Sequence, residues 1–317
     1  MLGVPKFGRT IKVTLAQPGL GVFTITDWQG GKAGPSSFDC DITINRHTRP
    51  EPQQASITVR GLSRETRSKI LALHKAAESQ AFKTRRVLKS GQVSIYAGYK
   101  DDAGLLFVGE LAPDGVKVQP GDPQPSLLLR ALDGRIAWEG RFVKKSVGPG
   151  IDLRTIQGVL KAAGDYMSGK TAEVAFEEEF PELIKRREGP AVHEGGFVLF
   201  GKSQKVNRDL CRDLGIQPFF LDGELIYLAR DAVLLDEAVT LVRGDTLLSV
   251  EELPLGRYQA VSLLDHRFRP GRQVNLREAS GKPIGAGTFR LDEATISASA
   301  GGDAFHAVLS LRPTVKT

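Results

Sequence analysis

Apolar and polar residues alternate along the first part of the chain. The clearest runs are Ile11, Val13 and Leu15, then Phe38, Cys40, Ile42 and Ile44, then Ile57 and Val59. An extended strand turns successive side chains to opposite faces, so this period of two predicts a sheet with one buried face. Further strands are expected at 92–97, 105–110, 114–118 and 126–132, and turns rich in Gly and Asp separate several of them.

One helix interrupts this β-rich segment. Ser63 is a residue type that caps helix N-termini, and Ile70, Leu73 and Ala77 follow it at helical spacing. We therefore predict a helix that begins directly after Ser63 and buries this apolar stripe.

The character of the sequence changes between residues 141 and 235. Asp152 and Ser203 are each positioned to cap a helix, and a glycine follows each apolar stripe to end it. The charged stretch 173–190 fits either a surface helix or a loop. Asp222-Gly223 lies between the apolar runs PFFL and ELIYLA, and this arrangement predicts a β-hairpin.

Alternation returns after residue 236. The expected strands are 239–243, 247–253, 258–264, 273–277, 286–297 and 304–311. Residues 55–110 and 260–297 also echo one another in the order of their short patterns. We predict an α+β, mainly β protein, with two related β-domains at 1–140 and 236–317 that flank a smaller α/β middle domain at 141–235.

Composition adds few constraints. Of 317 residues, 41% are hydrophobic and 25% are charged, which is ordinary for a globular protein. Lys and Arg outnumber Asp and Glu by 43 to 37, and the excess is scattered. The basic clusters 83–86 and 185–187 have no interleaved aromatic residues, so we interpret them as solvated surfaces. Nucleic-acid binding through these clusters is a weaker alternative.

The two cysteines and the start of the chain indicate a reducing compartment. Cys40 and Cys211 are far apart and have no neighbouring Cys or His, so neither a disulfide framework nor a zinc site is expected. The first residues lack the apolar core of a signal peptide. The sequence contains no run of about 18 apolar residues, so we expect no membrane span. We expect synthesis and folding in a cytoplasm.

Residues 196–203, GFVLFGKS, match the phosphate-loop pattern G-x-x-x-x-G-K-[ST]. A nucleotide-binding protein would use Gly196, Gly201, Lys202 and Ser203. A phosphate loop, however, needs an open turn of backbone N–H groups, and Phe-Val-Leu-Phe at the four variable positions favours a buried strand. We predict a strand, a turn at Gly201 and a helix capped by Ser203, and keep nucleotide binding as the alternative function.

Other catalytic and metal-binding patterns are absent from the sequence. The five histidines, His47, His74, His193, His266 and His306, are not spaced as metal ligands. The carboxylate run Glu177–Glu179 is typical of a solvated acidic face. No G-x-S-x-G elbow occurs. We predict no catalytic, cofactor-binding or metal-binding residues, no cofactor, and no enzymatic activity.

Short patterns in the first segment follow one another in a recognisable order, at 38–62, 93–99, 106–110 and Leu132-Asp133-Gly134. Residues 93–110 read as a strand, Ala-Gly-Tyr, an acidic turn and Leu-Phe-x-Gly. This order resembles that of the baseplate or tail-tip hub proteins of tailed bacteriophages.

The later segments carry the rest of the resemblance. Residues 206–228 look like the family's helix, Leu-Gly, strand and Asp-Gly hairpin. Residues 261–264 and 269–274 look like its Ser-Leu-Leu and Pro-Gly-x-x-Val passage. Phe305-His306-Ala307 stands where the family often has a Trp-centred segment, which is a departure from its pattern.

The resemblance implies a structural virion protein. Such hubs are homotrimers in which each subunit carries two tube-like antiparallel β-barrel domains. Three subunits then present six similar units to the six-fold tail tube. Their opposite face provides a three-fold symmetric binding surface for the central spike, and DNA passes through the central bore. The implied partners are the tail tube protein, the spike protein, and baseplate wedge, sheath or other tail-tip proteins. The implied location is the virion tail, assembled in the host cytoplasm, without sequence-specific nucleic-acid binding.

Overall fold

The computed structural model describes the two β-rich segments almost completely and part of the middle of the chain. The described residues are 8–29, 32–34, 37–84, 91–99, 102–121, 124–134, 142–147, 197–202, 205, 208, 209, 212, 216–222, 224–229, 232–234 and 236–314. We call 8–134 the N-terminal half and 236–314 the C-terminal half.

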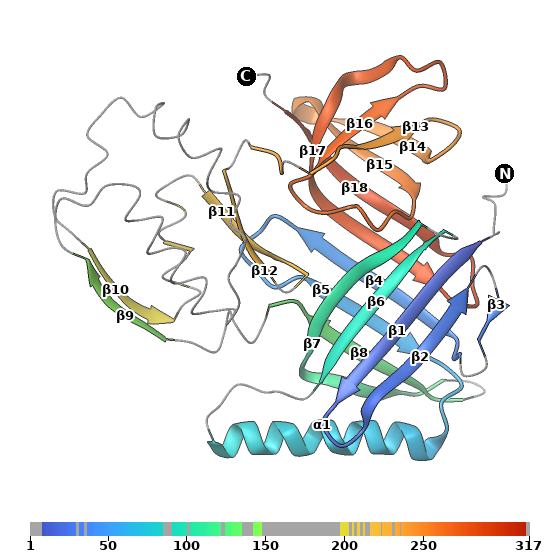
Figure 1. Cartoon of the computed structure of the whole chain (residues 1–317), viewed down its shortest axis with the longest axis vertical. Helices are drawn as coiled ribbons and strands as arrows, with labels where there is room; N and C mark the ends of the chain where they lie inside the picture. Colours follow the sequence, from blue (N-terminus) through green and yellow to red (C-terminus); the bar gives the residue numbers. More distant parts are fainter. Residues whose placement is uncertain are drawn as a thin grey trace.

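Antiparallel β-structure dominates both halves (Figure 1). The N-terminal half contains β1 Arg9–Gln17, β2 Gly21–Gln29, β3 Lys32–Ala33, β4 Cys40–His47, β5 Gln54–Val59, α1 Arg64–Thr84, β6 Gln92–Tyr99, β7 Asp102–Gln119 and β8 Ser126–Leu132. The middle contains β9 Phe142–Val147, β10 Phe197–Lys202, β11 Ile216–Leu221 and β12 Glu224–Ala229. The C-terminal half contains β13 Val239–Val242, β14 Leu247–Leu253, the 3-10 turn Pro254–Gly256, β15 Arg257–Leu263, β16 Gln273–Arg277, β17 Pro283–Ser299 and β18 Phe305–Pro313.

One sheet of fourteen strands runs through both halves. Its main path is β14-β15-β18-β17-β4-β5-β8-β7-β6-β1-β2-β3, and β16 joins β17 to β13. The sheet is not closed, so the structure confirms a mainly antiparallel β fold but not two separate barrels. The pairs β9–β10 and β11–β12 form two further small antiparallel sheets.

The two halves repeat the same strand order. In the N-terminal half the neighbours are β4-β5-β8-β7-β6-β1, and in the C-terminal half they are β14-β15-β18-β17-β16-β13. The only difference in direction among these pairs is that β13 is parallel to β16, whereas β1 is antiparallel to β6. The weak echo in the sequence therefore corresponds to a repeated β unit.

Alternating residues of each strand form a continuous core. In β5, for example, Ala55, Ile57 and Val59 are buried, and the residues between them are half-buried. Buried residues of both halves belong to one apolar cluster. The opposite side of β14-β15-β18-β17-β4-β5-β8-β7, which we call the polar face, carries the exposed or half-buried residues Thr43, Asn45, Ser56, Thr58, Gln259, Thr295, Ser297 and Ser310.

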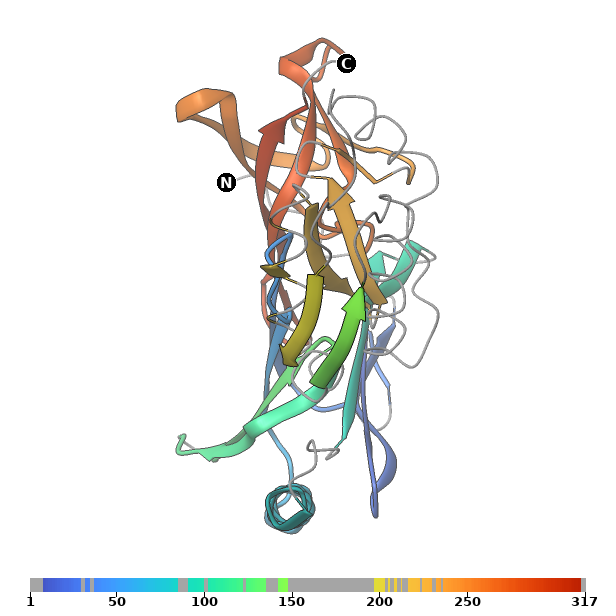
Figure 2. The same ribbon diagram turned by 90° about the vertical axis from the view of Figure 1, so that its left-hand side faces the viewer.

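The helix α1 lies across one end of the sheet and is seen end-on in Figure 2. Its predicted start is confirmed, because the backbone N–H of Thr66 donates to Oγ of Ser63 at 3.1 Å. Ile70 and His74 are buried on its inner side. No helix among the described residues has the length and apolar character needed to cross a membrane.

Replacing Ser63 with alanine is expected to lower the free energy of unfolding by about 1 kcal/mol, since it removes the N-cap acceptor. Urea denaturation of both proteins measures the difference. Ser68→Ala changes an exposed residue inside the same helix and should have little effect. An equal loss in both variants would contradict the capping role of Ser63.

Most predicted strands are confirmed, and one prediction is corrected. The stretches 105–110 and 114–118 are not separate strands, because β7 runs unbroken from Asp102 to Gln119. The pairing of β7 with β8 shifts its register between Leu111 and Val116, and Pro113 and Gly115 lie within this irregular stretch. Asp114, between them, adopts a φ of 52°. The predicted hairpin at Asp222 is confirmed by the pairing of β11 with β12. The helix predicted after Asp152 lies outside the described residues.

Candidate functional site

The two halves are joined edge to edge, and we call this junction the seam. Residues Glu293–Ser299 of β17 pair antiparallel with Asp41–His47 of β4. The same residues of β17 pair with β18 on their other side, so the sheet continues without interruption from one half to the other. The seam is the place where the repeated units meet, and it organises the polar contacts around it.

Arg46 is the central residue of the seam. Its side chain is fully buried, and it donates hydrogen bonds to the backbone oxygens of Phe268, at 2.9 Å, and Leu106. It also forms an ion pair with Oδ1 of Asp222 at 2.7 Å. Burial lowers the pKa of Arg46, and the carboxylate of Asp222 opposes that shift. One side chain thus connects both halves to the middle hairpin.

The β11–β12 hairpin contacts the N-terminal half at a second point. The side-chain amide of Gln53 donates to the backbone oxygen of Phe220, and the backbone N–H of Asp133 donates to the oxygen of Gln53 at 2.8 Å. Gly134 has a φ of 65°, and a Cβ atom there would lie 2.0 Å from Cδ1 of Phe220. Only glycine therefore allows the Phe220 ring to pack so closely on this strand end.

The C-terminal half contacts the same hairpin through Arg290. Its side chain donates to the backbone oxygen of Ala232 at 2.9 Å and to Oε1 of Gln217 at 2.7 Å, and it pairs with Asp292 at 3.1 Å. Gly271 lies against Leu228. The hairpin is thus fixed to both halves, each of which contributes one buried arginine.

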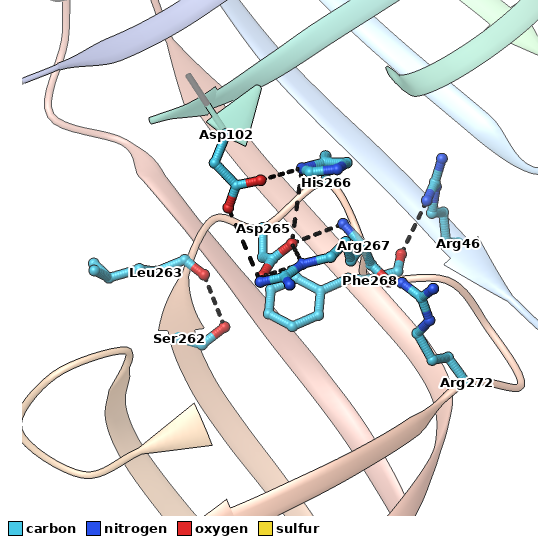
Figure 3. A network of polar contacts seen from close by, with 9 residues as sticks. All are labelled: Arg46, Asp102, Ser262, Leu263, Asp265, His266, Arg267, Phe268 and Arg272. Carbon is cyan, nitrogen blue, oxygen red and sulfur yellow. Dashed lines mark hydrogen bonds and ion pairs between the residues drawn. The ribbon is translucent and has the colours of Figure 1, made fainter. Parts of the chain in front are cut away.

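The connection between β15 and β16 carries a polar network beside the seam (Figure 3). Nε of Arg267 donates to Oδ1 of Asp265 at 2.9 Å, and its Nη2 donates to Oδ2 at 2.7 Å. Burial alone would raise the pKa of Asp265, but the hydrogen bonds from Arg267 outweigh it and lower that pKa. The His266 ring covers Gly104 of β7, where a Cβ would lie 2.1 Å from it. These contacts lock the connection onto the N-terminal half.

A small pocket opens between the halves next to this network. It measures about 130 Å³, and its lining residues are Tyr99, Asp102, Thr240, Leu241, Thr246, Leu263, Leu264, Asp265 and Arg267. Ligand pockets usually measure about 300–1,000 Å³. The pocket is therefore too small for a nucleotide.

The GFVLFGKS stretch does not have the geometry of a phosphate loop. Phe197 to Lys202 are all in β10, which pairs antiparallel with β9 along its whole length. The four variable positions are therefore extended, as the sequence predicts, and do not form a turn of N–H groups. The predicted turn at Gly201 is wrong, because Gly201 pairs with Val143 and Lys202 with Phe142, so the strand continues through both residues. Lys205, Arg208, Asp209 and Arg212 are helical, in line with the predicted second helix. Gly196 and Ser203 lie outside the described residues.

Lys202→Ala is expected to leave nucleotide binding unchanged, because a lysine in a regular strand pair cannot enclose a triphosphate. Titration calorimetry with ATP and Mg²⁺ on both proteins is the measurement. ATP binding by the wild-type protein that is lost in Lys202→Ala would indicate that residues 196–203 form a phosphate-binding loop.

The remaining candidate residues occupy separate places in the fold. Among the described residues, no three His, Cys, Asp or Glu side chains gather as metal ligands would. Burial lowers the pKa of His47, and His74 lies 3.2 Å from Glu78 within α1. Burial, with Asp39 and Asp41 nearby, raises the pKa of Cys40 to about 12. The acidic run 177–179, the basic cluster 185–187, His193 and Cys211 lie outside the described residues.

The two buried arginines, Arg46 and Arg290, were not predicted from the sequence. The burial of Arg46 could have been recognised, because Arg46 is the next residue in the alternating series Cys40, Ile42 and Ile44, whose side chains all face the core. A charged residue at a position that alternation assigns to the core indicates a buried partner. Arg290 gives no such signal, since it precedes an irregularity at Leu291 and Glu293 where the register shifts.

No protein-family model and no curated protein sequence matches this chain. Solved structures do match it over nearly its whole length. A tail protein from Neisseria meningitidis matches with a TM-score of 0.53 and 10% identity, covering 97% of this chain and 97% of that one. The 43 kDa tail protein of prophage MuSo2 from Shewanella oneidensis matches with a TM-score of 0.55 and 8% identity, covering 95% and 97%.

A third match comes from a secretion system. The E. coli c3393 protein is described as a component of the type VI secretion system with structural similarity to the T4 bacteriophage tail proteins gp27 and gp5. It matches with a TM-score of 0.51 and 9% identity, covering 88% of this chain and 74% of that one. At these identities the likeness is one of fold. The resemblance to phage tail proteins that the sequence suggested is thus confirmed in the architecture.

Proposed function

We propose that this chain, which has the fold of bacteriophage tail proteins, is a non-enzymatic tail hub that joins the tail tube to the central spike. In this proposal it forms a homotrimer, with residues 1–140 and 236–317 as two tube-like domains and 141–235 as a middle domain. The tail tube protein and the spike protein are its main partners, and wedge, sheath or other tail-tip proteins are further ones. Its location is the virion tail, after assembly in the host cytoplasm.

The repeated strand order is the observation that carries this proposal. Each chain contains two units with the same neighbours, joined in one sheet by the pairing of β17 with β4. Three such chains provide six similar units around a three-fold axis, which is what contact between a six-fold ring and a three-fold spike requires. A trimer with one unit per chain would present only three units to the ring.

The polar face suits the wall of a passage for DNA. Its residues are mostly uncharged hydroxyl and amide side chains, and its charges have both signs, with Asp41, Glu251 and Glu293 against Lys117, Arg130 and Arg257. Several of these charges are paired, as Arg60 is with Asp41 and Arg49 with Glu293 at 3.3 Å. Strong phosphate binding needs a concentration of basic side chains, and here basic residues are interspersed with acids and uncharged groups. A passage lined by this face would let DNA slide.

Electron microscopy of the purified protein with its spike protein tests the proposal. The expected particle has three-fold symmetry, and its end-on view shows six similar units around a central opening. Particles without three-fold symmetry, or without a central opening, would contradict the hub function.

A further inference from the structure

The two repeated units can be compared residue by residue through their strand pairs. The backbone N–H groups of Leu111 and Leu291 anchor the comparison, because each donates to the oxygen of the residue directly before a neighbouring strand, β6 or β16. Following the strand pairs outward from this anchor gives the remaining equivalents, which are Ala131 and Leu311, Ala55 and Tyr258, Gln53 and Gly256, and Asp133 and Pro313. The last two pairs mark the same end of each unit.

This end of the N-terminal half is covered by the β11–β12 hairpin. The backbone N–H of Asp133 donates to the oxygen of Gln53 at 2.8 Å, and the side-chain amide of Gln53 donates to the backbone oxygen of Phe220. The Phe220 ring packs directly on Gly134 and is fully buried. An aromatic side chain from the middle of the chain therefore occupies this end.

The equivalent end of the C-terminal half is open. A Cβ atom at Gly256 would lie 3.5 Å from Cγ of Pro313, so the turn between β14 and β15 packs on the end of β18. Leu255, the residue before Gly256, is 89% exposed, which is the largest value among the large hydrophobic residues of the described chain. The turn that carries it projects from the C-terminal half (Figure 2). We call Pro254, Leu255, Gly256 and Pro313 the open end.

The backbone of Leu255 indicates that its side chain serves a contact. Its φ of 65° and ψ of 28° lie in the left-handed region. Glycine and asparagine adopt this conformation much more readily than leucine does. A leucine here strains the turn and also exposes apolar surface to water, so it disfavours the free chain in two ways. Strain and apolar exposure at one position are typical of a residue that binds a partner.

Open and covered ends alternate in the proposed trimer. Equivalent strands of the two units run in the same direction, because β17 and β7 both run opposite to β4. Equivalent ends of the six units therefore lie on one face. Three of them carry their own β11–β12 hairpin and three are open, so this face has three-fold and not six-fold symmetry. A three-fold partner can contact all three open ends in the same way.

We propose that the open end is a docking site for the spike protein, which places an uncharged aromatic or aliphatic side chain against Leu255, as Phe220 is placed against Gly134. The inference rests on the proposed hub function and names the surface and the chemistry of its spike contact. The open end contains no ionisable side chain. Pro254 and Pro313 have no backbone N–H, so covering them leaves no donor of theirs unsatisfied.

Leu255→Asn tests the contact in the full-length chain with the purified spike protein. Asparagine accepts the left-handed backbone of the turn and removes the apolar side chain, so the variant should melt no lower than the wild type. Its affinity for the spike protein should fall about tenfold or more, because a buried leucine side chain contributes at least that factor. Val22→Asn is the matched control, since Val22 is 75% exposed in the β1–β2 hairpin, and it should leave the affinity unchanged. Titration calorimetry measures both.

A reporter at the same position identifies what covers the open end. Leu255→Cys labelled with an environment-sensitive fluorophore should report polar surroundings in the chain alone and apolar surroundings after addition of the spike protein. Val22→Cys with the same label should show no change. The chain without an added cysteine corrects for labelling at Cys211, and Cys40 is buried.

The outcomes separate the docking site from the function on which it rests. Weaker binding by Leu255→Asn, with a spectral change that requires the spike protein, supports the site. A trimer that binds the spike protein equally well with leucine or asparagine at position 255 overturns the site and leaves the hub proposal standing. Apolar surroundings before the spike protein is added also overturn the site, because a second copy or the middle domain then covers Leu255. A chain that neither forms a trimer nor binds the spike protein overturns both.

Discussion

Arg46→Met is expected to lower the free energy of unfolding by about 3–5 kcal/mol. The variant removes the cation from a fully buried site and leaves Asp222, which is 13% exposed, without its main partner. The backbone oxygens of Leu106 and Phe268 also lose their donor. Leaving buried acceptors unpaired costs more than the hydrogen bonds contributed. Denaturation followed by Trp fluorescence measures the loss.

Two comparisons make the Arg46 result specific. Arg49→Met changes a side chain that is 58% exposed and pairs with Glu293 on the surface, so its expected cost is below about 1 kcal/mol. Arg46→Met combined with Asp222→Asn should cost less than the sum of the two single changes, because the two residues are partners. Additive costs, or a loss no larger than that of Arg49→Met, would show that Arg46 does not hold the hairpin to the seam.

Gly134→Ala is expected to destabilise the protein by about 2–4 kcal/mol. The backbone of the alanine would have to adopt a φ of 65°. Its methyl group would lie 2.0 Å from the Phe220 ring, which is fully buried. The ring must move, and the hairpin moves with it. The cost therefore has a backbone part and a packing part.

Gly244→Ala isolates the backbone part. Gly244 has a φ of 83°, and a Cβ there meets nothing within 4 Å. Its expected cost is about 1 kcal/mol, from the left-handed conformation alone. Thermal or urea denaturation compares the two variants. Equal costs would contradict the close packing of Phe220 on Gly134.

Alternation predicted the strands well where a strand has one buried face. β8 was expected at 126–132 and is found there, because Leu127, Leu129 and Ala131 are all buried. β14 and β16 also match their expected bounds. Ser63 marked the start of α1 because capping is decided within a few neighbouring residues.

The parts that sequence reasoning missed depend on contacts between distant residues. Pro113 and Gly115 are residue types that usually end a strand, yet β7 continues beyond them because it pairs with β8 on both sides of this stretch. The sharing of one sheet by both halves depends on residues about 250 positions apart, such as Thr295 and Asn45. Arg46 contacts Asp222, which lies 176 positions further along the chain. Period-two patterns specify which face of a strand is buried and do not specify its neighbour.

The mass of the protein in solution tests the central claim most directly. Light scattering of the purified chain, alone and with its spike protein, distinguishes the states. The account predicts three times the chain mass of 34.4 kDa, either in the free protein or after addition of the spike, and no change with ATP and Mg²⁺. A chain that remains monomeric under all these conditions, or that changes its state only with nucleotide, would contradict it.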